Sequence, residues 1–99
     1  MVTVSARIQL LTTAEGGRHS AAASGYRPNL RFGELYTEVA ITFQDRRELA
    51  PGEECVAKVT FAYPDYVRGY LNVGAEFEIT EGGRRVGSGT IQRIEDAGA

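Results

Sequence analysis

The sequence predicts an all-β domain, either a barrel or a sandwich, from two observations. Apolar residues alternate with polar ones along most segments, which is the period of a half-buried strand and not that of a helix. Turns that contain glycine and proline separate these segments at short intervals, and no stretch has the pattern of a long amphipathic helix. A length of 99 residues suits a single domain, which we expect to span the whole chain, 1–99.

Six strands are expected in order along the chain. The first shows the alternation most clearly, because the apolar residues from Val2 to Leu10 share one parity and the polar residues between them share the other. Proline cannot donate a hydrogen bond to a ladder, so Pro28 is expected at an edge or at the start of the second strand. The predicted strands are 2–11, 26–33, 36–44, 54–62, 75–80 and 86–94.

The last predicted strand departs from simple alternation. Its apolar residues fall on both faces, since Val86 and Ile94 share one parity whereas Ile91 takes the other. The run Gly87-Ser88-Gly89 lies within this strand and indicates a bulge or a close approach of another backbone. The tail that follows, 95–99, is expected to be frayed.

Charge and composition exclude several classes of protein. Eleven Lys and Arg residues against 13 Asp and Glu residues give a net charge of −2, so no global positive field draws the protein to nucleic acid. A single cysteine, Cys55, excludes an internal disulfide and is expected to be a small core residue. The chain shows neither an export signal nor a membrane-spanning stretch, so we expect a cytoplasmic protein without membrane contact.

The tetrapeptide Glu-Gly-Gly-Arg occurs twice, at residues 15–18 and 81–84. Between two strands, Gly82-Gly83 has the composition of a tight hairpin turn, whereas the first copy opens a longer loop. Neither copy resembles a nucleotide-binding loop. Residues 82–87 have the glycine spacing of a phosphate loop, but Ser88 stands where that loop needs its lysine.

No enzyme is indicated. His19 is the only histidine, so a histidine-rich metal site is excluded, and no carboxylates pair at a spacing that demands acid–base catalysis. We therefore expect no catalytic residue, no metal and no cofactor.

One loop region is locally positive. Between residues 16 and 33, Arg18, Arg27 and Arg31 occur with His19 and without any acidic residue. This composition fits a surface that meets phosphates or an acidic protein face, and it fits an ordinary solvated face of a β protein equally well.

Three stretches, together with Leu49-Ala50-Pro51-Gly52-Glu53, resemble the C-terminal β-barrel domain of bacterial elongation factor Tu. The three are Glu15-Gly16-Gly17-Arg18-His19, Gly25-Tyr26-Arg27-Pro28-Asn29 and residues 77–89, from Phe77 to Gly89. The first two have the separation found in that family, and the match runs in order from about Ala6 to Ile94. The resemblance implies a six-stranded closed antiparallel barrel over about residues 3–94.

The resemblance also implies a function without catalysis. In that family the domain packs against the GTPase domain, contacts the exchange factor and touches the T stem of aminoacyl-tRNA. Carried over by position, the tRNA contacts fall on Arg18, His19, Arg27, Asn29, Glu81 and Gly82. These 99 residues include neither the middle barrel nor the GTPase domain, so the chain is not expected to bind GTP.

Departures from the family pattern point to a different use. A run of small residues, Ser20-Ala21-Ala22-Ala23, replaces large apolar ones in the first loop, and Glu38 places a carboxylate where the family has a small hydroxyl residue near the tRNA backbone. The segment from residue 63 to residue 70 offers Tyr63, Tyr66 and Tyr70 for a protein contact.

The leading hypothesis is a freestanding, non-catalytic binding module, active in translation as an accessory or mimic, whose partner is a protein. The alternative is weak binding of tRNA or other structured RNA through Arg18, His19, Arg27 and Arg31.

Overall fold

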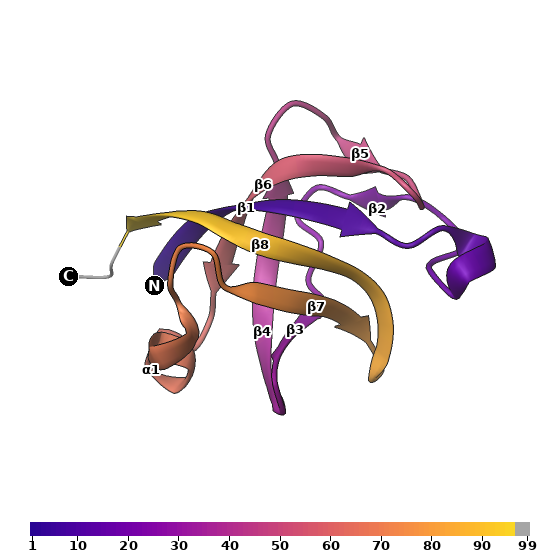
Figure 1. Cartoon of the computed structure of the whole chain (residues 1–99). Coiled ribbons are helices and arrows are strands. Elements are labelled where there is room, and N and C mark those ends of the chain that lie inside the picture. Colours follow the sequence, from indigo (N-terminus) through magenta and orange to yellow (C-terminus); the bar gives the residue numbers. More distant parts are fainter. Residues whose placement is uncertain (97–99) are drawn as a thin grey trace.

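Six segments with alternating apolar residues pair side by side and close into a ring (Figure 1). In the computed structural model, which describes residues 1–96, these antiparallel strands have the order β1-β6-β4-β3-β7-β8. Their bounds are β1 (Val2–Leu10), β3 (Asn29–Phe32), β4 (Leu35–Phe43), β6 (Glu54–Phe61), β7 (Glu76–Glu81) and β8 (Arg84–Asp96). The predicted six-stranded closed antiparallel barrel is therefore confirmed.

Several short elements were not predicted. A separate sheet pairs β2 (Ala22–Ala23) with β5 (Glu48–Leu49), and three short helical segments are present: η1 (Thr13–Glu15), α1 (Pro64–Val67) and η2 (Arg68–Tyr70). A two-residue strand or a single helical turn is too short to produce a periodic pattern in sequence. Within the described part of the chain, no helix has the length and apolarity to cross a membrane.

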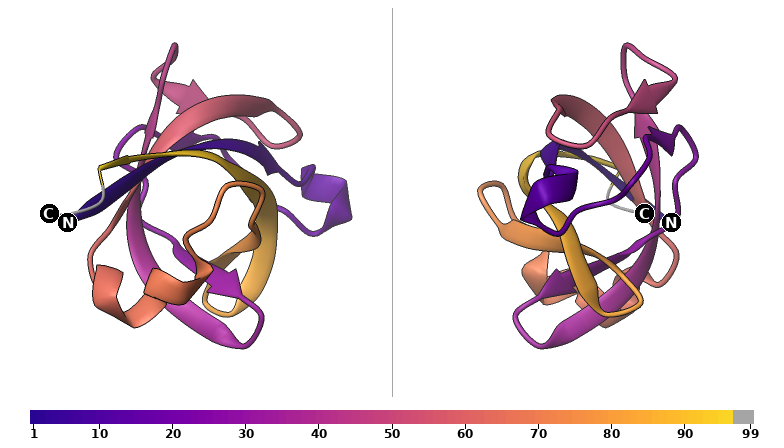
Figure 2. Two further views of the ribbon diagram at one scale, coloured as in Figure 1. Left: turned by 60° about the vertical axis from the view of Figure 1, so that its left-hand side comes forward. Right: turned by 90° about the vertical axis from the view of Figure 1, so that its right-hand side faces the viewer.

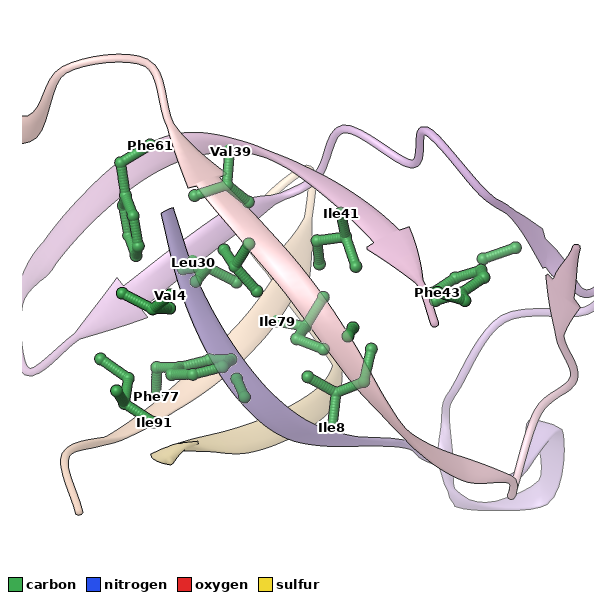
Figure 3. Close-up of a cluster of buried hydrophobic side chains, with 14 of the residues drawn as sticks. Val4, Ile8, Leu30, Val39, Ile41, Phe43, Phe61, Phe77, Ile79 and Ile91 are labelled. Carbon is green, nitrogen blue, oxygen red and sulfur yellow. The ribbon is translucent and has the colours of Figure 1, made fainter. Parts of the chain in front are cut away.

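The inward side chains of the barrel form one continuous core (Figure 3). Every second residue of β1, from Val2 to Leu10, is buried as the alternation predicts. The ring of Phe32 lies 6.2 Å from that of Phe61 and 5.7 Å from that of Phe77, in tilted arrangements that aromatic pairs favour. Cys55 is only half-buried against this core, and burial raises the pKa of its thiol.

The second predicted strand begins later than expected. β3 starts at Asn29 and not at residue 26, because the preceding Pro28 has no N–H to donate. Only an isolated bridge between Tyr26 and Ile41 extends the pairing beyond the proline.

Gly87 and Gly89 are sites of close approach, as their spacing predicts. A Cβ on Gly89 would lie 2.5 Å from Cζ of Phe77, and a Cβ on Gly87 would lie 2.6 Å from the carbonyl oxygen of Gln9. The pairing of β7 with β8 also shifts between Ile79 and Thr80, next to these glycines. β8 can therefore bend tightly here while it pairs with strands on both sides.

The prediction of a frayed tail from residue 95 is wrong at its start. β8 continues to Asp96, and the Glu95 carboxylate accepts hydrogen bonds from Ser5, Lys58 and Arg93. These donors lie on three different strands, so Glu95 ties the end of β8 to the barrel wall. Residues 97–99 of the predicted tail lie outside the described residues.

The loops gather at the two ends of the barrel (Figure 2). Val2 pairs with Phe61, which also pairs with Val39, so the start of β1, the end of β6 and the segment containing α1 share one end. The left view of Figure 2 faces this end, and the right view faces the opposite end with η1 and the β7–β8 turn. The predicted site residues are distributed between these ends.

Thr37 carries a buried hydroxyl with no hydrogen-bond partner in the structure. We predict that Thr37→Val raises the free energy of unfolding by about 1 kcal/mol, because the substitution removes an unsatisfied polar group at nearly constant volume. The matched control is Thr80→Val, because the equally buried Thr80 hydroxyl donates a 3.1 Å hydrogen bond to the Asn29 carbonyl. Thr80→Val should lower the free energy of unfolding by about 1 kcal/mol. Urea unfolding measures both, and destabilisation by Thr37→Val would contradict the prediction.

Glu95 should make stability depend on pH. Hydrogen bonds from Lys58, Ser5 and Arg93 lower the pKa of its carboxyl to about 2 from its ordinary value of 4.5. Because the folded pKa lies below the unfolded one, the contribution is complete above pH 4.5 and is lost as the pH falls towards 2. We expect Glu95→Gln to lower Tm at neutral pH and this difference to shrink below pH 4.5. Glu34→Gln, at a carboxylate without an ion pair among the described residues, is the control, and a pH-independent difference for Glu95→Gln would refute the prediction.

Candidate functional site

The first Glu-Gly-Gly-Arg copy ends a short helical turn. The Thr12 hydroxyl accepts a hydrogen bond from the Glu15 N–H, while the Glu15 carboxylate accepts one from the Thr12 N–H, which forms a capping box. Gly16 then closes the turn with φ +97°, a left-handed conformation that favours glycine. This local structure directs the chain so that Arg18 leaves the loop towards the barrel.

The second copy is a two-residue hairpin turn, as predicted. Glu81 pairs with Arg84 across the β7–β8 ladder, and the two glycines between them both have positive φ, 59° and 80°. The two glycines are therefore explained by the positive φ angles that this turn requires.

The two copies contact each other in space. Arg18 of the first copy and the hydroxyl of Tyr26 both donate hydrogen bonds to the carboxylate of Glu81 in the second copy. The Arg18 guanidinium also lies 5.1 Å from the centroid of the Tyr26 ring, a cation–π distance. Burial and the Glu81 hydrogen bond raise the pKa of Tyr26, so its hydroxyl stays a donor at physiological pH.

Most residues of the predicted RNA- or partner-binding surface lie near this network. Tyr26 contacts Glu81 and Asn29 pairs with Thr80, so Arg27 lies between two residues that are joined to the end of β7. We name this surface the arginine end and define it by Arg18, His19, Arg27, Glu81, Gly82 and Arg84. Asn29 lies at the border of the arginine end. It pairs with Thr80 of β7 on one side and with Glu38 of β4 on the other, and Glu38 lies nearer the middle of the barrel wall.

Arg31 does not belong to the arginine end. Its guanidinium pairs with Glu78 at 3.1 Å and donates to the Gly33 carbonyl at 2.6 Å. It also lies 5.9 Å from the ring centroid of Tyr36. Arg31 is therefore held on the outer wall, two residues beyond Asn29 along β3.

The predicted locally positive surface is partly neutralised. The segment from residue 16 to residue 33 has no acidic residue of its own, but β7 supplies Glu81 to Arg18 and Glu78 to Arg31. Within residues 1–96, Arg27 and Arg84 form no ion pair, and His19 next to Arg18 is exposed. Only part of the arginine surface is thus available to an external anion.

The predicted tyrosines lie at the opposite end of the barrel. Tyr63 and Tyr66 are 60% and 65% exposed and line a shallow hollow with Pro64. Tyr70 packs its ring 5.6 Å from that of Phe32 and remains 45% exposed. We name this surface the tyrosine end and define it by Met1, Tyr63, Tyr66, Tyr70 and Val73. The sixth large apolar side chain that the described residues expose, Tyr36, lies on the outer wall opposite Arg31.

Tyr36 and Val73 were missed by the sequence analysis. Tyr36 lies on the outward parity of β4 and pairs with Arg31 of β3, so it is exposed on the barrel wall.

A hollow of about 850 Å³ crosses the outer wall over β8. Its lining includes Arg7, Arg31 and Arg85 with Ser88 and Thr90 between them. Within the described residues, Arg7 pairs with Glu54 at 3.0 Å, and Arg31 and Arg85 share Glu78 at 3.1 and 3.6 Å. Glu76 also lines the hollow, so its three arginines face three carboxylates. The hollow therefore offers little uncompensated charge to a ligand.

No group of three or more metal-ligating side chains comes together within residues 1–96. His19 and Cys55 lie on different elements, in the first loop and on β6, and no pairing between them is formed.

Tyr26 should stabilise the arginine end. We predict that Tyr26→Phe lowers the free energy of unfolding by about 1 kcal/mol, because the hydroxyl donates to the charged carboxylate of Glu81 in a half-buried setting. Tyr36→Phe is the matched control, since within the described residues the Tyr36 hydroxyl forms no hydrogen bond, and it should change stability by less than about 0.5 kcal/mol. Equal urea midpoints for the two variants would contradict this assignment.

The comparison with protein families agrees with the fold. A family model of the elongation factor Tu C-terminal domain matches residues 1–95. This domain is a non-catalytic β-barrel of a translation factor, and the closed six-stranded barrel described above has that architecture. The chain therefore belongs to the elongation factor Tu C-terminal domain family.

Proposed function

We propose that this protein is a non-catalytic binding module whose main partner is another protein, bound at the tyrosine end. The observation that carries the proposal is the exposure of Tyr63, Tyr66 and Tyr70 on the one segment that joins β6 to β7, at the end of the barrel where Met1 precedes β1. Exposed tyrosines combine a large apolar area with a polar hydroxyl, and tyrosine is enriched in protein interfaces. Isolated apolar residues on a surface need no explanation, but a cluster at one end is typical of an interaction surface.

The family membership supports a role of this module in translation. A domain of this family serves its factor by binding, without chemistry of its own. We infer that the partner is a component of the translation machinery, so that the chain acts as an accessory to that machinery or as a mimic of the factor.

Weak binding of tRNA or other structured RNA at the arginine end is the second candidate. Arg27, Arg84 and His19 favour it, because within residues 1–96 none of them is paired with a carboxylate. Two observations limit its strength: Arg18 is engaged by Glu81, and the carboxylate of Glu38 lies opposite Asn29 in the ladder. A carboxylate at that place repels phosphate.

Site-specific photocrosslinking in a lysate of the source cells tests the proposal. A photoreactive amino acid replaces Tyr66 in one variant and Arg84 in a matched variant at the opposite end. We expect a protein adduct from position 66 that survives ribonuclease and no such adduct from position 84.

Titration with aminoacyl-tRNA tests the alternative in parallel. Submicromolar affinity that falls steeply with salt and is lost in the double variant Arg27→Ser, Arg84→Ser would favour RNA and overturn the proposal of a protein partner.

A further inference from the structure

The connection between β6 and β7, residues 63–73, carries α1 and η2 and forms only local hydrogen bonds. We call it the β6–β7 segment. The N–H groups of Tyr66, Leu71 and Asn72 donate to carbonyls two or three residues earlier in the same segment. Within residues 1–96, no hydrogen bond and no ion pair joins the β6–β7 segment to a strand of the barrel.

Side-chain packing alone holds this segment on the barrel. Val67 is fully buried as part of the core, and Leu71 packs against the core while half-buried. Tyr70 adds a ring contact, 5.6 Å from the centroid of Phe32. In the left view of Figure 2, the segment lies across part of the opening of the barrel.

The first loop is attached in a different way. The N–H of Gly25 donates to the Ile41 carbonyl of β4 at 2.8 Å, and the Ser24 hydroxyl accepts a hydrogen bond from the N–H of Phe43. Arg18 adds its ion pair with Glu81. That loop cannot leave the barrel without breaking these bonds, whereas the β6–β7 segment can.

A buried polar group lies at the end of the barrel that the segment covers. Thr37 is on β4, and the pairing of β4 with β6 begins only at Val39. Thr37 therefore lies beyond that ladder, where the chain leaves β6 for α1, and α1 packs against β4. Its hydroxyl is buried and has no partner among the described residues, so closing this end leaves a polar group without a hydrogen bond.

We propose that the β6–β7 segment is a lid that opens as one unit while the barrel stays folded. Opening separates Val67, Tyr70 and Leu71 from the core but breaks no hydrogen bond to a strand. Water then reaches the Thr37 hydroxyl, which offsets part of the cost. Because the three exposed tyrosines of this end lie on the lid, opening rearranges them together. This opening is a property of the isolated chain and needs no partner.

Hydrogen exchange of the intact protein, followed by NMR at urea concentrations below the unfolding transition, tests the lid. We expect the amides of Tyr66, Leu71 and Asn72 to share one opening free energy and to be at least about a hundredfold less protected than the strand amides. Their protection should also depend less on urea, because opening the lid exposes less surface than unfolding the barrel. The amide of Gly25, bonded to β4, is the control and should be better protected than the lid amides.

Three variants test whether the lid and the barrel open separately. Val67→Ala should speed exchange of the lid amides about tenfold or more, although it removes none of their hydrogen bonds. Thr37→Val should slow the same amides about fivefold, because closure no longer buries an unpaired hydroxyl. Thr80→Val, at the arginine end, should speed the strand amides that exchange through global unfolding and leave the lid amides unchanged. Thr37→Val, which is expected to stabilise the protein, decides the question if Val67→Ala does not fold.

Any of three results would overturn the lid. The first is equal protection of the lid amides and the strand amides, and the second is faster exchange of the lid amides in Thr80→Val, since both mean that the segment opens only with the barrel. The third is unchanged exchange of the lid amides in Val67→Ala or in Thr37→Val, which means that the segment does not open as a unit from the core beneath it.

Discussion

Closure of the barrel depends on how tightly β8 packs between β1 and β7 around Gly87 and Gly89. The Phe77 ring and the backbone carbonyls of β1 occupy the space that a Cβ at these positions would need. With this pairing made, every barrel strand has a neighbour on both sides, and within residues 1–96 only the two-residue strands β2 and β5 keep an open edge. The barrel therefore presents outward side chains and the loops at its two ends.

The two ends have different physical character because of how each satisfies its charges. At the arginine end, Glu81 accepts hydrogen bonds from Arg18 and Tyr26, so part of the positive charge maintains the loop that follows the first tetrapeptide. At the tyrosine end, Arg68 pairs with Asp65 on the same segment, and the tyrosines beside this pair, Tyr63 and Tyr66, are exposed. An exposed ion pair stabilises a fold only slightly, but its presence or absence decides which charge a partner meets.

The pattern of charge along the chain was a poor guide to charge on the surface. The loop region from residue 16 to residue 33 is positive in sequence, yet its partners lie far along the chain: Glu81 is 63 residues from Arg18, and Glu78 is 47 residues from Arg31. Alternation places Glu78 on the outer face of β7. It does not say that β7 lies beside β3, because strand order depends on the closure of the whole sheet.

The sequence by itself determined the all-β class, the six barrel strands and the hairpin at Gly82-Gly83, because alternation and positive-φ turns are local properties. Closure into a barrel followed from the family resemblance. Tertiary structure alone decided the position of α1 and the pairing of β2 with β5, which are too short to leave a periodic signal. It also decided the network at Glu81 and the packing of Tyr70 against Phe32, because both join residues that only the folded barrel brings together.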